Sequence, residues 1–307
     1  MKVVVMGASG MLGAMLTDWL ARDPSLQIKA TIRRRDLLAH CRARVPDVEW
    51  KEFDADSDCE TWLPILEGAT WVINAIGVIK PFIHDDIPAE VERAIAVNAF
   101  FPHRLARVAA RVGARVLQIA TDCVYSGHTG NYRESSAHDP LDVYGKSKSL
   151  GEVRSPCVHH LRCSIVGPES KHGASLLEWF LRQPSGASVR GYTNHHWNGI
   201  TTLQFARTCH GIIRGGLKLP HLQHLVPLDR VAKSELLRSF AQAFGRTDIC
   251  IEPSEAREAL DRTLETENHE LNQQIWTAAG YATFPTIQQM VVELAQFDFR
   301  FARCRTL

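Results

Sequence analysis

The chain has 307 residues, of which 45% are hydrophobic, and a formal net charge of +1. This is enough for one large α/β domain with a smaller lobe, or for two domains that share a cleft. The near-zero charge excludes a broad basic surface for nucleic acid. No apolar stretch approaches the roughly 20 residues that cross a bilayer, and the eight cysteines form no CxxC pair. We therefore expect a cytoplasmic protein with reduced thiols and no membrane partner.

The first predicted strand, residues 2–6, leads directly into a glycine-rich segment. This segment reads Gly7-Ala8-Ser9-Gly10-Met11-Leu12-Gly13, a GxxGxxG spacing, and an amphipathic helix follows it. Glycines here permit a tight turn and a close approach to a pyrophosphate, whose charge meets the N–H groups at the helix N-terminus. An ordinary turn is the alternative. The order strand, turn, helix favours a dinucleotide site, with contacts expected from Gly7, Ser9, Gly10, Met11 and Leu12.

The second predicted strand, residues 27–32, ends in Arg33-Arg34-Arg35-Asp36. An acidic residue at this position typically binds the ribose of NAD(H), whereas arginines pair with the 2′-phosphate of NADP(H). We expect Arg33 and Arg34 to favour NADP(H). The alternative is a solvated basic flank with Asp36 as the cap of the next helix.

Further strands are expected near residues 47–53, 70–75, 115–120 and 158–165, with helices between them. This alternation predicts a Rossmann-type α/β fold, a doubly wound parallel sheet covered on both faces. The strongest helix pattern spans residues 88–112, a surface that is also a candidate for packing in a homodimer. Glycine and proline interrupt the pattern after residue 167. We therefore expect an NADP(H)-binding domain at 1–167 and, at 168–307, mostly a substrate-binding lobe with some segments returning to the first domain.

Polar residues accumulate where the predicted strands end. Ligands of an open parallel sheet bind outside the carboxyl ends of the strands. Each of these residues also has a structural interpretation as a helix cap, a turn or a polar contact. Taken in strand order they favour a cofactor site that includes Asp54, Asn74, Ala75, Ile76 and, from the long helix, Asn98.

The segment Tyr144-Gly145-Lys146-Ser147-Lys148 places a phenol and an ammonium four residues apart. On a helix both lie on one face, where the cation can lower the pKa of the phenol and make it a usable proton donor or acceptor. The same spacing occurs by chance on solvated helices. It gains weight here from the nucleotide fingerprint upstream.

Several segments together resemble the extended short-chain dehydrogenase/reductases, and most closely their dTDP-4-dehydrorhamnose reductase (RmlD-like) branch. The resemblance covers about the first 167 residues. It is carried by Gly7 to Gly13, Asn74-Ala75, Val97-Asn98, residues 120–127 (ATDCVYSG) and residues 143–152 (VYGKSKSLGE).

The resemblance implies a role for three catalytic residues. Thr121 would hydrogen-bond the substrate carbonyl, Tyr144 would protonate it, and Lys148 would hold the nicotinamide ribose, so that the last two also contact the cofactor. The implied reaction is NADPH-dependent reduction of the 4-keto group of a nucleotide-activated deoxysugar. The family serine, tyrosine, phenylalanine and aspartate are replaced by Ala120, Cys123, Tyr125 and Ser126, so different sugar contacts are expected.

Two other functions stay open. One is an epimerase or dehydratase of the same superfamily, although dehydratases usually carry an acidic pair after the threonine, and here Asp122 is followed by Cys123. The other is a non-catalytic NADP-binding regulatory subunit, as in the β subunit of methionine adenosyltransferase. An intact set of Thr121, Tyr144 and Lys148 favours catalysis.

The C-terminal half departs most from the family pattern at residues 191–202. Trp197 there is suited to stack on a sugar or base. The adjacent histidines 195 and 196 lack further ligands nearby, so we expect no metal. Lys171 and His172 are candidates for a diphosphate contact or for a solvated loop. The expected substrate contacts are thus Thr121, Cys123, Lys171, His172 and Trp197.

Overall fold

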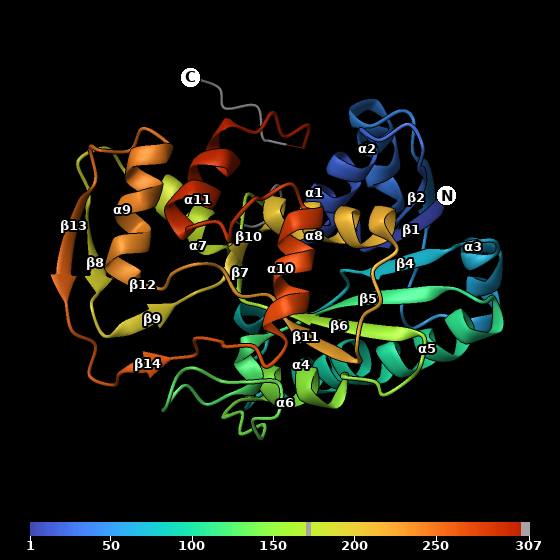
Figure 1. Cartoon of the computed structure of the whole chain (residues 1–307), viewed down its shortest axis with the longest axis horizontal. Coiled ribbons are helices and arrows are strands. Elements are labelled where there is room, and N and C mark those ends of the chain that lie inside the picture. The colour runs from blue at the N-terminus through green and yellow to red at the C-terminus, as the bar shows by residue number, and fades with distance from the viewer. Residues whose placement is uncertain (170–172, 302–307) are drawn as a thin grey trace.

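Seven parallel strands form the central sheet of the computed structural model, which describes residues 1–169 and 173–301 (Figure 1). Their order is β3-β2-β1-β4-β5-β6-β11, and each neighbouring pair is parallel. The predicted α/β fold of the doubly wound type is confirmed. The strands are β1 (Lys2–Met6), β2 (Gln27–Ile32), β3 (Glu49–Glu52), β4 (Trp71–Asn74), β5 (Arg115–Ala120), β6 (Val158–Arg162) and β11 (Leu222–His224).

The central strands β1 and β4 are buried along nearly their whole length because helices cover both faces of the sheet. In β1, Val3 and Val5 pack into one core and Val4 and Met6 into the other, since successive side chains point to opposite faces. The first core includes side chains of α1 (Met11–Leu20), α2 (Leu38–Arg44), α8 (Thr202–Gly215) and α10 (His269–Ala278). On the opposite face lie α3 (Leu63–Leu66), α4 (Pro88–Ala94), α5 (Phe101–Arg111) and α6 (Val143–Leu150).

The second half of the chain builds a smaller part with three short sheets (Figure 1). β7 pairs with β10, β8 pairs with β13, and β9 lies between β12 and β14. The strands are β7 (Ile165–Val166), β8 (Ser188–Tyr192), β9 (His195–Trp197), β10 (Ile200–Thr201), β12 (Val231–Ala232), β13 (Cys250–Ser254) and β14 (Leu260–Asp261), and the helices are α7 (Leu176–Leu181), α9 (Lys233–Ala243) and α11 (Ile287–Gln296).

Two elements of the second half of the chain belong to the central sheet and its helices. α8 packs against α1, and β11 adds to the edge of the central sheet beside β6. Within the described residues, no helix has both the length and the apolar character needed to span a bilayer.

Two buried histidines lie on neighbouring strands at this edge of the sheet. His160 on β6 is 1% exposed, and burial lowers its pKa to about 4. Burial and the nearby Arg162 guanidinium also lower the pKa of His224 on β11. Both imidazoles are therefore neutral in the folded protein at neutral pH.

These histidines predict a loss of stability in mild acid. An unfolded histidine titrates near pH 6.5, so below that pH the unfolded state binds more protons than the folded state. The stability that they contribute is fully present above about pH 6.5 and is lost as pH falls toward about 4. Denaturant titrations at pH 7.5 and pH 5 should show the drop, and His160→Gln should reduce it. An unfolding free energy whose pH dependence is the same in both proteins would contradict this assignment.

Candidate active site

The turn between β1 and α1 is closed by glycines at two tight positions. Gly7 has a φ of +79°, a conformation that side chains rarely adopt. A Cβ on Gly13 would lie 2.2 Å from the carbonyl oxygen of Gly7, so α1 approaches the turn only because this residue is glycine. α1 begins after Gly10, an N-cap residue that makes no side-chain capping bond. Its first N–H groups are thus left for an anion, which fits a dinucleotide pyrophosphate.

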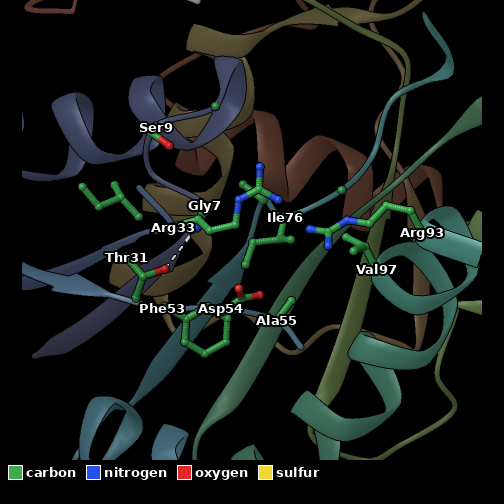
Figure 2. A pocket seen from close by; sticks show the side chains of 14 residues that line it. Gly7, Ser9, Thr31, Arg33, Phe53, Asp54, Ala55, Ile76, Arg93 and Val97 are labelled. Carbon is green, nitrogen blue, oxygen red and sulfur yellow. Dashed lines mark hydrogen bonds between the residues drawn. The ribbon is translucent and has the colours of Figure 1, made fainter. Parts of the chain in front are cut away.

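A pocket opens beside this turn at the carboxyl ends of the central strands (Figure 2). Its lining includes many of the predicted cofactor contacts: Gly7, Ser9, Gly10, Arg33, Asp54, Ala75 and Ile76. The remaining lining residues are Thr31, Ile32, Phe53, Ala55, Gly77, Arg93 and Val97. The predicted contacts outside this lining are Met11, Leu12, Arg34, Asn74, Asn98, Tyr144 and Lys148. The Leu12 side chain is 5% exposed and packs in the core.

Two buried asparagines shape the loop that follows β4. Asn74 accepts the N–H of Ile76 at 3.0 Å and donates to Gln118 at 3.1 Å. Asn98 accepts the N–H of Val78 and donates to its carbonyl oxygen, both at 2.9 Å. The two amides therefore hold the loop that lines the pocket, and their direct contacts with a cofactor stay a prediction.

Asn98 lies in a π-helical turn, Ile95–Phe100, between α4 and α5. The sequence predicted one continuous helix over 88–112, and the structure interrupts it with this wider turn. The Asn98 amide also donates to the Ser147 hydroxyl on α6 at 3.2 Å. One side chain thus links the β4 loop to the helix that carries Tyr144.

Thr121, Tyr144 and Lys148 are brought together by the end of β5 and by α6. Asp142 caps α6 by accepting the N–H of Gly145 at 2.8 Å. The Thr121 hydroxyl donates to the Asp122 carboxylate at 3.2 Å. It is close enough to Tyr144 to lower the pKa of the phenol slightly. A Cβ on Gly145 would lie 2.2 Å from the Cys123 carbonyl oxygen, so glycine lets α6 come this close to the β5 segment.

The Lys148 ammonium lies against the β4 loop. A Cβ on Gly77 would approach Lys148 Nζ to 2.6 Å and Asn98 Oδ1 to 3.3 Å. Gly77 also lines the pocket. The Lys148 ammonium therefore lies beside a residue that lines the pocket.

Burial dominates the titration of these two groups. It raises the pKa of Tyr144 well above the ordinary value, with a smaller opposing contribution from the nearby Thr121 hydroxyl. It lowers the pKa of Lys148 to about 8. The sequence predicted a lowered pKa for Tyr144, and the direction in the structure is the opposite. Burial disfavours the phenolate, and the nearby Cys123, Asp122 and Asp142 raise the pKa further. Tyr144 is thus protonated at neutral pH.

Arg262 reaches this site from β14 and its following loop, far away in sequence. Its Nε donates to the Tyr125 carbonyl oxygen at 2.8 Å, and its Nη1 lies 3.9 Å from Cys123 Sγ. Burial raises the pKa of Asp122, and the positive charge of Arg262 partly offsets this rise. Burial raises the pKa of the Cys123 thiol to about 12, so this side chain is a neutral contact and not a nucleophile. No local motif marks Arg262 in the sequence.

A buried charged cluster, formed by Arg162, Glu152, Tyr125, His138 and His224, fixes the end of α6. Arg162 is 0% exposed and donates to the Glu152 carboxylate at 2.6 Å. It also contacts Tyr125 Oη at 2.5 Å, His138 Nε2 at 2.9 Å and His224 Nε2 at 3.0 Å. Glu152 follows α6 and Arg162 ends β6, so this pair connects the end of α6 to the sheet.

The predicted substrate residues of the second half have different outcomes. Trp197 on β9 packs against the first core, and a Cβ on Gly199 would lie 2.4 Å from its indole ring. His196, its neighbour on the strand, is exposed and lines a separate surface pocket. Lys171 and His172 lie outside the described residues.

Comparison with protein families gives a match to the RmlD substrate binding domain over residues 1–297. The chain belongs to this family. It therefore also belongs to the extended short-chain dehydrogenase/reductases that the sequence motifs resemble. It is 31% identical over 156 residues to dTDP-4-dehydrorhamnose reductase of Mycobacterium tuberculosis H37Rv, which covers 49% of this chain and 44% of that protein. The aligned part thus spans about half of each protein.

Solved structures agree with the fold over nearly the whole chain. The dTDP-4-dehydrorhamnose reductase of Bacillus anthracis in complex with NADP has a TM-score of 0.70 and 17% identity, covering 95% of this chain and 98% of that one. The UDP-glucuronic acid 4-epimerase of Bacillus cereus, in complex with UDP-glucuronic acid and NAD, has a TM-score of 0.73 and 12% identity, covering 96% and 99%. A reductase and an epimerase are equally similar, so the fold alone does not choose between them.

Proposed function

We propose that the chain catalyses the NADPH-dependent reduction of the 4-keto group of a nucleotide-activated deoxysugar, as expected of a dTDP-4-dehydrorhamnose reductase-like enzyme. Membership of the RmlD family supports an NAD(P)-dependent oxidoreductase. The observation that carries the proposal is the arrangement of three side chains: Tyr144 and Lys148 lie on the same helix, α6, Thr121 is close to the Tyr144 phenol, and Lys148 Nζ is beside Gly77 of the pocket.

The pocket fits the coenzyme at two points. At the first point, Gly7 and Gly13 have no side chains, so a pyrophosphate can approach the backbone of the turn. At the second point, Gly77 has no side chain that would clash with Lys148 Nζ. When bound, NADPH supplies the hydride for the carbonyl carbon. In this proposal Arg33 lies toward the adenosine ribose, and Lys148 holds the ribose of the nicotinamide.

The remaining steps fall to the side chains around Tyr144. Thr121 donates a hydrogen bond to the substrate carbonyl and polarises it. Tyr144 gives its proton to the oxygen as negative charge develops there, which forms the hydroxyl group. Lys148, a cation below about pH 8, stabilises the tyrosinate that remains. We propose Cys123, Trp197, Lys171 and His172 as further substrate contacts.

A protonated Tyr144 is the acid that the proposed reduction requires. An enzyme that begins by oxidising its substrate needs a base at this position, whereas a reductase needs an acid. The buried phenol is in its acidic form at neutral pH. A panel of 4-keto-6-deoxy nucleotide sugars, incubated with NADPH, tests the proposal: a reductase consumes one NADPH per product, an epimerase shows no net consumption, and a regulatory subunit shows binding without turnover.

The two predicted arginines are expected to differ in their effect on NADPH. Arg33 lines the pocket, whereas Arg34 pairs with Asp36 at 3.1 Å. Arg33→Ala should raise the Kd for NADPH by about tenfold or more, since a hydrogen bond to a charged group contributes roughly 1.5–3 kcal/mol. Arg34→Ala should leave the Kd nearly unchanged. Calorimetric titration measures both, and equal losses for NADPH and NADH in Arg33→Ala would show that Arg33 does not bind a 2′-phosphate.

A further inference from the structure

We propose that Arg93 on α4 is a second phosphate-binding arm that, together with Arg33, makes the pocket selective for the phosphorylated ribose of NADP(H). This inference rests on the coenzyme site of the proposed function. It assigns to the α4 side of the pocket a role that the arginine-rich segment after β2 was expected to perform alone.

Arg33 and Arg93 come from opposite walls of one pocket. Arg33 directly follows β2, and Arg93 lies in the last turn of α4. Figure 2 shows the two side chains extending toward the same space, with Ile76 between them. Two guanidinium groups that face one opening form a fork for an anion with several acceptor oxygens.

The other arginine expected at this place is engaged elsewhere. Arg34 forms an ion pair with Asp36 and is 61% exposed. It does not line the pocket. The pair of cations that the pocket offers is therefore Arg33 and Arg93, which are 60 residues apart in sequence, and not the adjacent Arg33 and Arg34.

Arg93 forms an ion pair with Asp56. Arg93 Nη1 donates to Asp56 Oδ2 at 2.8 Å, while the side chain stays 39% exposed. A guanidinium has five N–H donors, so one ion pair leaves others for a phosphate. The Asp56 carboxylate also places a negative charge close to the anion, which limits the affinity. Neutral ribose hydroxyls gain little from either charge, so the pair discriminates between the two coenzymes.

The test compares the Kd of NADPH and of NADH in three variants of the full chain at fixed, low ionic strength. Arg93→Ala should raise the Kd for NADPH by about tenfold and that for NADH by less than about twofold. Asp56→Asn should lower the Kd for NADPH by a few-fold, because a repulsive charge is removed. Arg111→Ala is the matched control, since Arg111 forms a similar exposed pair with Glu60 at 2.6 Å outside the pocket. It should change neither Kd.

Each outcome bears on a separate claim. Unchanged NADPH binding in Arg93→Ala, or equal weakening of NADPH and NADH, would overturn the role of Arg93 and leave the proposed function intact. A wild-type chain that binds neither coenzyme would overturn the proposed function itself.

Discussion

Replacing Tyr144 by phenylalanine should lower turnover by about 100-fold or more while the fold and NADPH affinity stay nearly intact. The substitution removes only the phenolic hydroxyl, which lies close to Thr121 and in our proposal carries the proton for the substrate oxygen. The ring stays, so the packing of α6 is preserved. Steady-state kinetics beside a thermal melt separate the loss of chemistry from a loss of structure.

Tyr192→Phe provides a control for this variant. Tyr192 ends β8, where its ring lies beside the His195 ring, away from the Thr121 segment. Its turnover should match that of the wild type. Wild-type turnover in Tyr144→Phe would refute the assignment of Tyr144 as proton donor.

Replacing Glu152 by glutamine should lower the free energy of unfolding by about 3 kcal/mol or more, the cost of leaving a buried charge without its counterion. Arg162 is fully buried, and Glu152 supplies the carboxylate of this cluster. Glutamine has nearly the same shape, so the change isolates the charge. Denaturant unfolding at pH 7.5 measures the difference.

Glu60→Gln is the matched control for the buried pair. Glu60 pairs with Arg111 at 2.6 Å, but both side chains are more than half exposed. Such surface pairs contribute roughly 0–1 kcal/mol. A similar small loss in both variants would mean that the Arg162 charge is stabilised by its other partners and does not depend on Glu152.

Local sequence patterns predicted the parts of the site that depend on local geometry. The glycine spacing around Gly7 and Gly13 determines how β1 meets α1, and the four-residue spacing of Tyr144 and Lys148 determines their common helical face. The chemistry of Thr121 came from the family resemblance. The order of the parallel strands then brings these segments together, because the loops at their carboxyl ends share one edge of the sheet.

Contacts between distant segments were not predictable in this way. Arg93 looks like an ordinary solvated helix charge in the sequence, and only the position of α4 beside the pocket gives it a role. Arg262 reaches the β5 end through the path of β14, which no short motif encodes. The rise in the pKa of Tyr144 likewise depends on how much surrounding protein excludes water, a property of the assembled fold.

Transfer of deuterium tests the central claim most directly. NADPH labelled at C4 of the nicotinamide, prepared with deuterium on either face, is incubated with the chain and a 4-keto-6-deoxy nucleotide sugar. The account predicts that one of the two labelled coenzymes delivers its deuterium to C4 of the sugar, with one NADP⁺ formed per product. A product changed at another ring carbon without net NADPH oxidation, or bound NADPH that never reacts with any sugar of the panel, would contradict it.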